Sequence, residues 1–321
     1  MLQNKCSNIG AISGASAGAV NAVTPAHGWA QARTADPVDA CESARKALRQ
    51  LWRNIAALNP SDILSEGLTQ WFSGAWFTGQ TGTQPPNPMT PLMRPILLDI
   101  NPVRRLLARD IDFKAVAESK QPPIFISATQ ALTGQSHVFS GNGLDLAAVS
   151  ASVCVSTLFR TVKQFVVQPY WNGGFSSNPP LYPLIKRNAP EGQDIILVQI
   201  LPLHRPKIPQ QPHEIFERMT ELAFNASVLS KMRGIDFVNR QIAAGRLTEG
   251  EPYKTVRLYR IDATPFFAQL PPYWKLSTYP LLIDQLYEQG EQAGTAWLET
   301  HLRDFGQRST AEIPEKYEKS L

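Results

Sequence analysis

One serine near the start of the chain is surrounded by very small residues, in the stretch G-A-S-A-G at positions 14–18. The apolar residues 9–13 before it predict a short buried strand, and residues 17–23 after it predict the start of a helix. A G-x-S-x-G sequence between a strand and a helix is the nucleophile-elbow pattern, in which a sharp turn presents the serine hydroxyl. We therefore predict that Ser16 is a nucleophile.

The neighbours of Ser16 fit this prediction for steric and electrostatic reasons. Gly14 and Gly18 are expected where the chain and the helix pass too closely for a side chain. The N–H of Ala17, at the positive end of the helix, would stabilise a developing oxyanion. The alternative is a tight packing turn with a serine that does no chemistry, because the motif also occurs by chance.

A nucleophilic serine needs a base, and histidine is the usual one. The chain has five histidines, and a histidine-dependent α/β-hydrolase would use one that follows the serine, such as His204 or His301. None of the five lies in a tight glycine-containing turn, and Ser16 has almost no chain before it. A histidine base therefore stays an open but disfavoured alternative.

A second candidate turn follows the apolar residues 164–171, which predict a strand. Here the sequence reads W-N-G-G-F, with Asn172 followed by Gly173 and Gly174. Such a turn holds the asparagine side chain in one direction. From the residues alone, an ordinary Asn-Gly turn explains this stretch.

Together the two turns resemble the conserved blocks of patatin-like phospholipases. ISGASAGAVNA, at 12–22, resembles the nucleophile block of that family, and WNGGFSSNPPLYPLI, at 171–185, resembles its second block, which begins Asp-Gly-Gly or Asp-Gly-Ala. FISAT at 125–129, TLF at 157–159 and the stretch around 194–229 are also similar to bacterial members. The resemblance extends from about residue 9 to about residue 240.

The resemblance implies a catalytic dyad in place of a triad. In that family the serine attacks an ester carbonyl, and the aspartate of the second block takes the serine proton. The implied substrates are acyl lipids (phospholipids, lysophospholipids or glycerides), with no cofactor and no metal. In this chain Ser16 would be the nucleophile, Ala17 an oxyanion donor and Asn172 the residue at the base position, while Gly14, Gly18, Gly173 and Gly174 would permit the two turns.

Asn172 departs from the family pattern in a way that affects the chemistry. A carboxylate accepts a proton, whereas a neutral amide does not, so Asn172 can orient Ser16 but not deprotonate it. We expect an impaired lipid acyl hydrolase. The alternative is a catalytically dead pseudo-hydrolase that binds a lipid or a partner. Asp145, Asp194 and Asp236 are possible substitutes for the base, but none lies in a matching turn.

A second departure concerns the strand that carries a glycine-rich block in the family. That block precedes the serine and completes the oxyanion hole, and no such block precedes Ser16 here. We therefore expect a patatin-like domain that lacks the first strand of the family. Losing one oxyanion donor typically costs about 10²–10³-fold in rate.

Alternating strand and helix patterns predict an α/β fold, which the resemblance sharpens to a three-layer α/β/α arrangement with a mixed, mostly parallel sheet. We expect one domain over residues 1–306 and a polar, flexible tail over 307–321. Residues 194–202 predict a central strand covered on both faces. The other expected strands are 122–130, 136–141, 164–171 and 255–263, and the expected helices are 36–58, 101–117, 144–159, 213–245 and 281–305.

The composition limits the possible partners. The chain has 321 residues, 43% of them hydrophobic, and 31 basic against 27 acidic residues give a net charge of +4. This mild balance does not favour nucleic-acid binding, although a cationic face could meet an anionic membrane. Three widely spaced cysteines match no metal site and predict free thiols in a reducing compartment, so we expect a cytoplasmic protein with peripheral membrane contact.

Residues 67–95 form an unusual stretch in which four aromatic residues precede a Gly/Thr/Gln/Pro tract. This stretch predicts a long loop that acts as a lid or touches a membrane, or else aromatic side chains that pack on the core. The four residues are Trp71, Phe72, Trp76 and Phe77.

Overall fold

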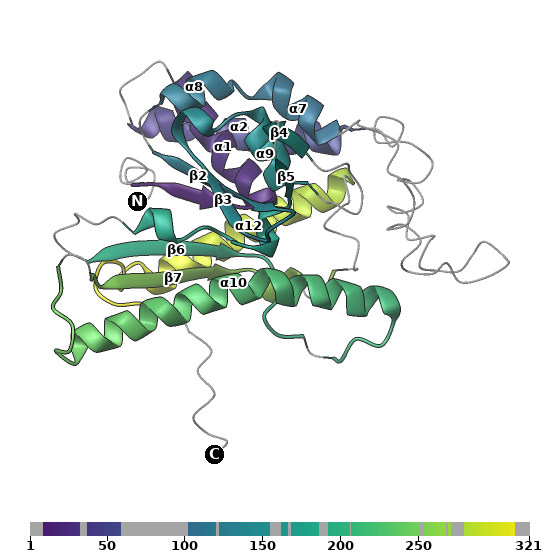
Figure 1. Ribbon diagram of the computed structural model, residues 1–321. Coiled ribbons are helices and arrows are strands. Elements are labelled where there is room, and N and C mark those ends of the chain that lie inside the picture. The colour runs from purple at the N-terminus through teal and green to yellow at the C-terminus, as the bar shows by residue number, and fades with distance from the viewer. Residues whose placement is uncertain are drawn as a thin grey trace. The chain divides into compact units, whose positions relative to one another are not determined.

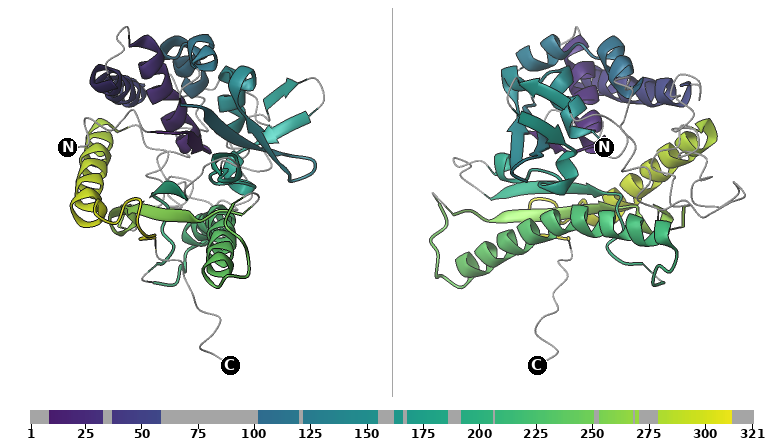
Figure 2. Two further views of the ribbon diagram at one scale, coloured as in Figure 1. Left: turned by 90° about the vertical axis from the view of Figure 1, so that its left-hand side faces the viewer. Right: turned by 45° about the vertical axis from the view of Figure 1, so that its right-hand side comes forward.

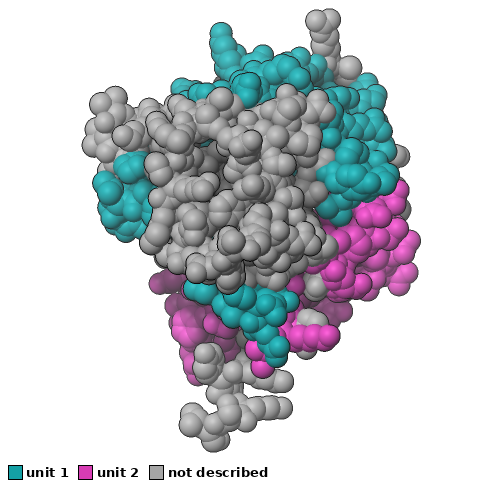
Figure 3. Space-filling view, turned by 90° about the vertical axis from the view of Figure 1, so that its right-hand side faces the viewer, with its two compact units in different colours: residues 1–180, 209–220, 271–284 teal, residues 181–208, 221–270, 285–321 magenta. Residues whose placement is uncertain are grey.

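The computed structural model divides the chain into two compact units, which are coloured separately in Figure 3. The first unit comprises residues 1–180, 209–220 and 271–284, and the second comprises residues 181–208, 221–270 and 285–321. The structure describes residues 9–32, 37–58, 102–119, 122–154, 162–165, 168–185, 192–205, 207–250, 253–267, 269–270 and 279–311.

The first unit contains a five-stranded mixed sheet. The strands are β1 (Ile12–Gly14), β2 (Ile124–Gln130), β3 (Ser136–Phe139), β4 (Val162–Phe165) and β5 (Gln168–Trp171). The order is β1-β2-β5-β4, with β3 also paired to β2. Only β1 runs parallel to β2, while the other described pairs are antiparallel. The prediction of a mixed sheet is confirmed, but "mostly parallel" is wrong for this sheet, because the pairs β2–β3, β2–β5 and β4–β5 are all antiparallel. Two strands, β4 and β5, are described where one strand over 164–171 was expected.

The described residues of this unit form the helices α1 (Ala17–Gln31), α2 (Pro37–Ala56), α7 (Pro102–Asp110), α8 (Phe113–Glu118) and α9 (Leu146–Ser152) beside the sheet. The predicted helix over 36–58 is confirmed as α2. The predicted helix over 101–117 is instead two helices, because the Asp112 carboxylate accepts a hydrogen bond from Ala115 N and starts α8. The helix predicted over 144–159 ends earlier, since α9 stops at Ser152.

Small residues let α1 pack closely in this unit. Its buried face carries Ala19, Val20 and Val23, which share one apolar cluster with Ile126 of β2 and Val149 of α9. Figure 1 and Figure 2 show α1 beside β1 and α2, and the contacts between α1 and these two elements agree with the pictures. The sheet and α9 thereby fix the start of α1 at Ala17, directly after Ser16.

The second unit contains a two-stranded parallel sheet of β6 (Gln193–Gln199) and β7 (Val256–Asp262). The long helix α10 (Pro212–Ala243) enters this unit at residue 221, and Figure 1 shows it running alongside the two strands. Its side chains Val228, Met232 and Ile235 pack in a cluster with Ile195 and Val256. The unit also holds α11 (Thr264–Phe267) and the part of α12 (Pro280–His301) from residue 285.

One expectation about this unit needs correction. Residues 194–202 were predicted as a central strand covered on both faces, but Ile196 and Val198 of β6 are 44% and 69% exposed. Among the described residues of this unit, these two side chains of β6 have little cover. In the segment expected to be a tail, Thr310 N and Ala311 N both donate hydrogen bonds to Leu258 O of β7. The domain boundary at residue 306 stays a prediction.

The two described cysteines differ in their bonding. Cys154 is a buried free thiol, whereas Cys41 is disulfide-bonded, so the expectation of free thiols is wrong for Cys41. Over the described residues, no helix combines the length and the apolar character that a membrane crossing requires.

Candidate functional site

Ser16 lies at the junction of β1 and α1 in a strained backbone conformation. Its φ is 55° and its ψ is −127°, and in the described part of the chain it is the one non-glycine residue with positive φ. Such a conformation costs about 1–3 kcal/mol and persists only where the surroundings enforce it. The turn predicted from the G-x-S-x-G sequence is therefore present, with Ser16 half-buried at its apex.

The two glycines of the motif have different reasons to be glycine. A Cβ on Gly14 would lie 2.1 Å from Gly18 O and 2.4 Å from its carbonyl carbon, which is impossible without a backbone shift. A Cβ on Gly18 would meet nothing within 4 Å. The steric argument from the sequence therefore holds for Gly14, whereas Gly18 has room for a side chain.

Helix α9 holds the backbone of Ser16 from the other side. Ser16 N donates to Ser152 Oγ at 3.0 Å, and the Ser152 side chain is fully buried. In the first turn of α1, Gly18 N and Ala19 N donate to Ala15 O and Ser16 O. Among the described residues nothing accepts from Ala17 N, so this N–H at the positive end of the helix is available to an anion.

Asn172 follows β5 directly and is buried. Its Oδ1 accepts a hydrogen bond from Gly174 N at 2.8 Å, which caps the short 3₁₀ helix η4 (Gly173–Phe175). Its Nδ2 donates to Ser16 Oγ at 2.9 Å. The two turns are thus in direct contact, although 156 positions separate them along the chain.

Strand β2 contacts the Asn172 turn and fixes its position. A Cβ on Gly173 would lie 2.1 Å from Ser127 O, so the turn rests directly on the strand backbone. Ser127 Oγ donates to Ser177 O at 2.6 Å, and Thr129 Oγ1 donates to Asn172 O at 2.8 Å. Both hydroxyls are buried, and they stand two residues apart on one face of β2.

Ser127, Thr129 and Ser152 support the site and were missed by the sequence analysis. The signal was a serine and a threonine at alternate positions of an otherwise apolar strand. Buried hydroxyls must find partners, but the sequence did not say which partners these would be.

The orientation of the Asn172 amide follows from the backbone. Gly174 N is a donor, so the atom that faces it must be the acceptor Oδ1, and Nδ2 is left to face Ser16. Ser16 Oγ therefore accepts a hydrogen bond from the Asn172 amide, and over the described residues Asn172 is its one side-chain partner. This arrangement orients the hydroxyl, but it offers no group that accepts the hydroxyl proton.

The two described histidines of the first unit have other partners. His27 Nδ1 accepts a hydrogen bond from Asp112 N, and the His137 ring packs against Phe139 and Tyr170. His204 and His301, the two alternatives for a histidine-dependent hydrolase, belong to the second unit. The His213 side chain lies outside the described residues.

The three aspartates considered as substitutes have other partners. Asp145 caps α9 by accepting from Ala147 N and Ala148 N, and Asp236 pairs with Arg240. Asp194 is held by Arg257 and Tyr259. Burial alone would raise the pKa of Asp194, but these two hydrogen bonds outweigh it and hold the pKa below its usual value. Each carboxylate therefore has a structural role.

No group of three or more His, Cys, Asp or Glu residues suited to a metal ion occurs in the described ranges. The segment 67–95, predicted as a lid or a membrane contact, lies outside the described residues. No protein-family model matches this chain, and no curated protein matches it.

Proposed function

We propose that this chain is a patatin-type lipid acyl hydrolase with a three-layer α/β/α fold, in which Asn172 occupies the position of the base. The observation that supports the proposal most is the 2.9 Å contact between Asn172 Nδ2 and Ser16 Oγ. Two glycine turns remote in sequence meet there, as a serine–aspartate dyad requires. The acyl lipid would be the substrate, without a cofactor and without nucleic acid.

In this proposal Ser16 Oγ attacks the ester carbonyl and Ala17 N–H stabilises the resulting oxyanion. The strained backbone places Ser16 at the apex of the turn, directly before α1. The positive end of this helix favours the negative charge of the oxyanion. Over the described residues the serine proton has no acceptor, because Asn172 is itself a donor at this contact. Loss of a general base lowers the rate by about 10²–10⁴-fold, so ester cleavage by this chain is slow.

An aspartate at position 172 would restore the base with little rearrangement. One carboxylate oxygen would keep the hydrogen bond from Gly174 N, and the other would replace Nδ2 and accept the Ser16 hydroxyl. The two side chains have nearly the same shape. The turn already present therefore suits the active dyad.

The test compares hydrolysis of p-nitrophenyl butyrate by the parent protein and by three variants. We expect Asn172→Asp to raise kcat/KM by about 10²-fold or more, and Ser16→Ala in that background to abolish the gain. Asn142→Asp is the matched control, because it makes the same charge change at an exposed 3₁₀ residue. A correctly folded Asn172→Asp variant no faster than Asn142→Asp would refute the proposal.

The amide orientation also favours a second candidate, a pseudo-hydrolase that binds an acyl lipid without cleaving it. The Nδ2 donor occupies one of the two lone pairs of Ser16 Oγ and takes no proton from it, which suits a binding site better than a reactive one. This candidate predicts that cis-parinaric acid binds equally to the parent and to Ser16→Ala, that Ser16→Trp blocks binding, and that Asn172→Asp remains inert.

A further inference from the structure

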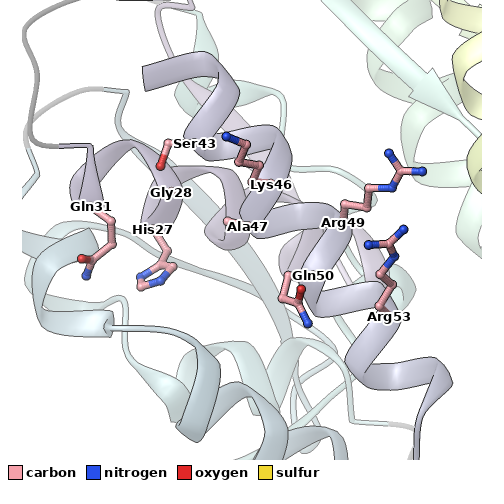
Figure 4. Close-up of a pocket in the computed structure, with 9 residues that line it drawn as sticks. All are labelled: His27, Gly28, Gln31, Ser43, Lys46, Ala47, Arg49, Gln50 and Arg53. Carbon is pink, nitrogen blue, oxygen red and sulfur yellow. The ribbon is translucent and has the colours of Figure 1, made fainter. Parts of the chain in front are cut away.

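A groove lies between the C-terminal half of α1 and the middle of α2, well away from Ser16 along the helix. Its volume is about 480 Å³. The α1 side of the lining includes His27, Gly28 and Gln31, and the α2 side includes Lys46, Arg49 and Arg53 (Figure 4). All of these residues belong to the first unit.

The helices are in backbone contact at the bottom of this groove. A Cβ on Gly28 would lie 2.5 Å from Ala44 Cα and 2.7 Å from Ser43 O, so only glycine permits the crossing. Trp52 Nε1 donates to Asn21 Oδ1 at 2.9 Å and adds a second link between the helices. The groove is therefore held by the packing of α1 on α2.

The α2 side of the groove is cationic. Lys46, Arg49 and Arg53 are spaced by three and four residues, so they share one face of the helix, and all three are exposed. The carboxylates of α2 are confined to its beginning, where Glu42 lies 4.0 Å from Lys46. No carboxylate belongs to the lining.

The α1 side adds neutral hydrogen-bond donors. His27 Nδ1 accepts from Asp112 N, so in the neutral ring the proton is on Nε2. Burial lowers the pKa of His27, although Asp112 and Asp110 oppose this shift. Asp110 is itself bound by Arg109 and Asn54. Gln31 contributes an amide N–H₂ to the lining.

We propose that this groove binds a phosphoryl group. Two guanidinium groups match the paired oxygens of a phosphate, and a lysine adds a point charge. The same chemistry is offered by free phosphate and by the headgroup of an anionic lipid. The inference rests on the α1–α2 geometry and not on the proposed hydrolase activity.

Two binding measurements on the full chain separate these sources. Inorganic phosphate is titrated by calorimetry, and vesicles of phosphatidylcholine with and without phosphatidylglycerol are tested by co-sedimentation. The test variant combines Lys46→Gln, Arg49→Gln and Arg53→Gln. The matched control combines Lys114→Gln, Arg240→Gln and Arg303→Gln, which remove the same charge at exposed positions outside the lining.

We expect the test variant to lose at least tenfold in affinity and the control to stay within about twofold of the parent. Saturable binding of inorganic phosphate identifies the free ion as a ligand. Binding to phosphatidylglycerol vesicles alone identifies a lipid headgroup. Either result supports the proposal only if the test variant loses it. Equal losses in both variants, or no binding to either probe by the folded parent, would overturn the proposal; far-UV circular dichroism checks folding.

Discussion

The two ends of α1 are surrounded by different kinds of residue. At the N-terminal end, Ser16 sits among Gly14, Gly18, Ser152 and Asn172, none of which carries a charge, and the contacts are made by backbone atoms and short side chains. At the C-terminal end, the groove is lined by long cationic side chains of α2 that reach into solvent.

The two sites need different kinds of support from the surrounding chain. A nucleophile must be held in one position, so the chain fixes it with close backbone contacts and a strained φ. Ion recognition tolerates movement, because a long side chain finds a charge without a fixed backbone. Substitutions at the Ser16 end should therefore change stability, and those at the groove should change mainly binding.

The largest effect is expected from filling the close backbone contacts. Gly14→Ala and Gly173→Ala each place a Cβ 2.1 Å from a carbonyl oxygen, which forces a backbone shift. We expect each to lower the free energy of unfolding by about 3 kcal/mol, measured by urea denaturation. Gly18→Ala is the control from the same motif, and it should be neutral or stabilise α1 by up to about 1 kcal/mol.

The contrast between the two ends of α1 would be wrong if Gly14→Ala were as stable as Gly18→Ala, since the backbone of the Ser16 turn would then tolerate a side chain. It would also break down if the three groove substitutions cost as much as Gly14→Ala. Exposed substitutions of this kind usually change stability by no more than about 0.5 kcal/mol.

A smaller effect is expected at the contact between α9 and the Ser16 backbone. Ser152→Ala removes the acceptor of Ser16 N and leaves that N–H without a protein partner, which costs about 1–3 kcal/mol. Ser150→Ala is the control, because Ser150 is equally buried in α9 but donates to Leu146 O in its own helix. We expect Ser150→Ala to cost about 0.5 kcal/mol or less in the same denaturation experiment.

This pair also tests whether α9 positions the nucleophile. In the Asn172→Asp background, Ser152→Ala should slow labelling of Ser16 by a fluorophosphonate about tenfold, while Ser150→Ala leaves the rate unchanged. Equal labelling rates in the two variants would mean that the Ser152 hydrogen bond does not hold Ser16 in place.

The sequence predicted the Ser16 end much better than the groove, for a physical reason. A strained turn needs glycine and small residues at fixed spacing, so its pattern is visible in a single stretch of chain. Ser16 and Asn172 each lie in a turn with such a pattern, and the two turns are in contact. The groove depends on Gly28 meeting Ala44, and nothing local to either residue indicates that crossing.

The wrong predictions about the strands have a similar origin. Residues 164–171 are apolar enough to predict one strand, but hydrophobicity does not indicate that β4 and β5 pair with one another in antiparallel fashion. β6 reads as a buried strand because it is apolar on both faces, yet Ile196 and Val198 are exposed. Hydrophobicity predicted that a strand exists, but not what covers it.

The smallest expected effect is a pH dependence at the groove end of α1. Burial lowers the pKa of His27 below its ordinary value of 6.5, and Asp112 and Asp110 offset this only in part. Just below pH 6.5 the unfolded chain therefore binds more protons than the folded protein. Stability should be complete above pH 6.5 and should decrease as the pH falls towards the pKa of the folded state.

His27→Gln should flatten this part of the stability curve, measured as the difference in melting temperature between parent and variant across pH 5 to 8. No comparable dependence is expected from the Ser16 end, whose side chains do not titrate in this range. Bound phosphate should reduce the slope in the parent, because a nearby anion favours the protonated imidazole. If the melting temperature of His27→Gln still falls with pH as it does in the parent, other groups cause the pH dependence. The two ends of α1 would then not differ in their response to pH.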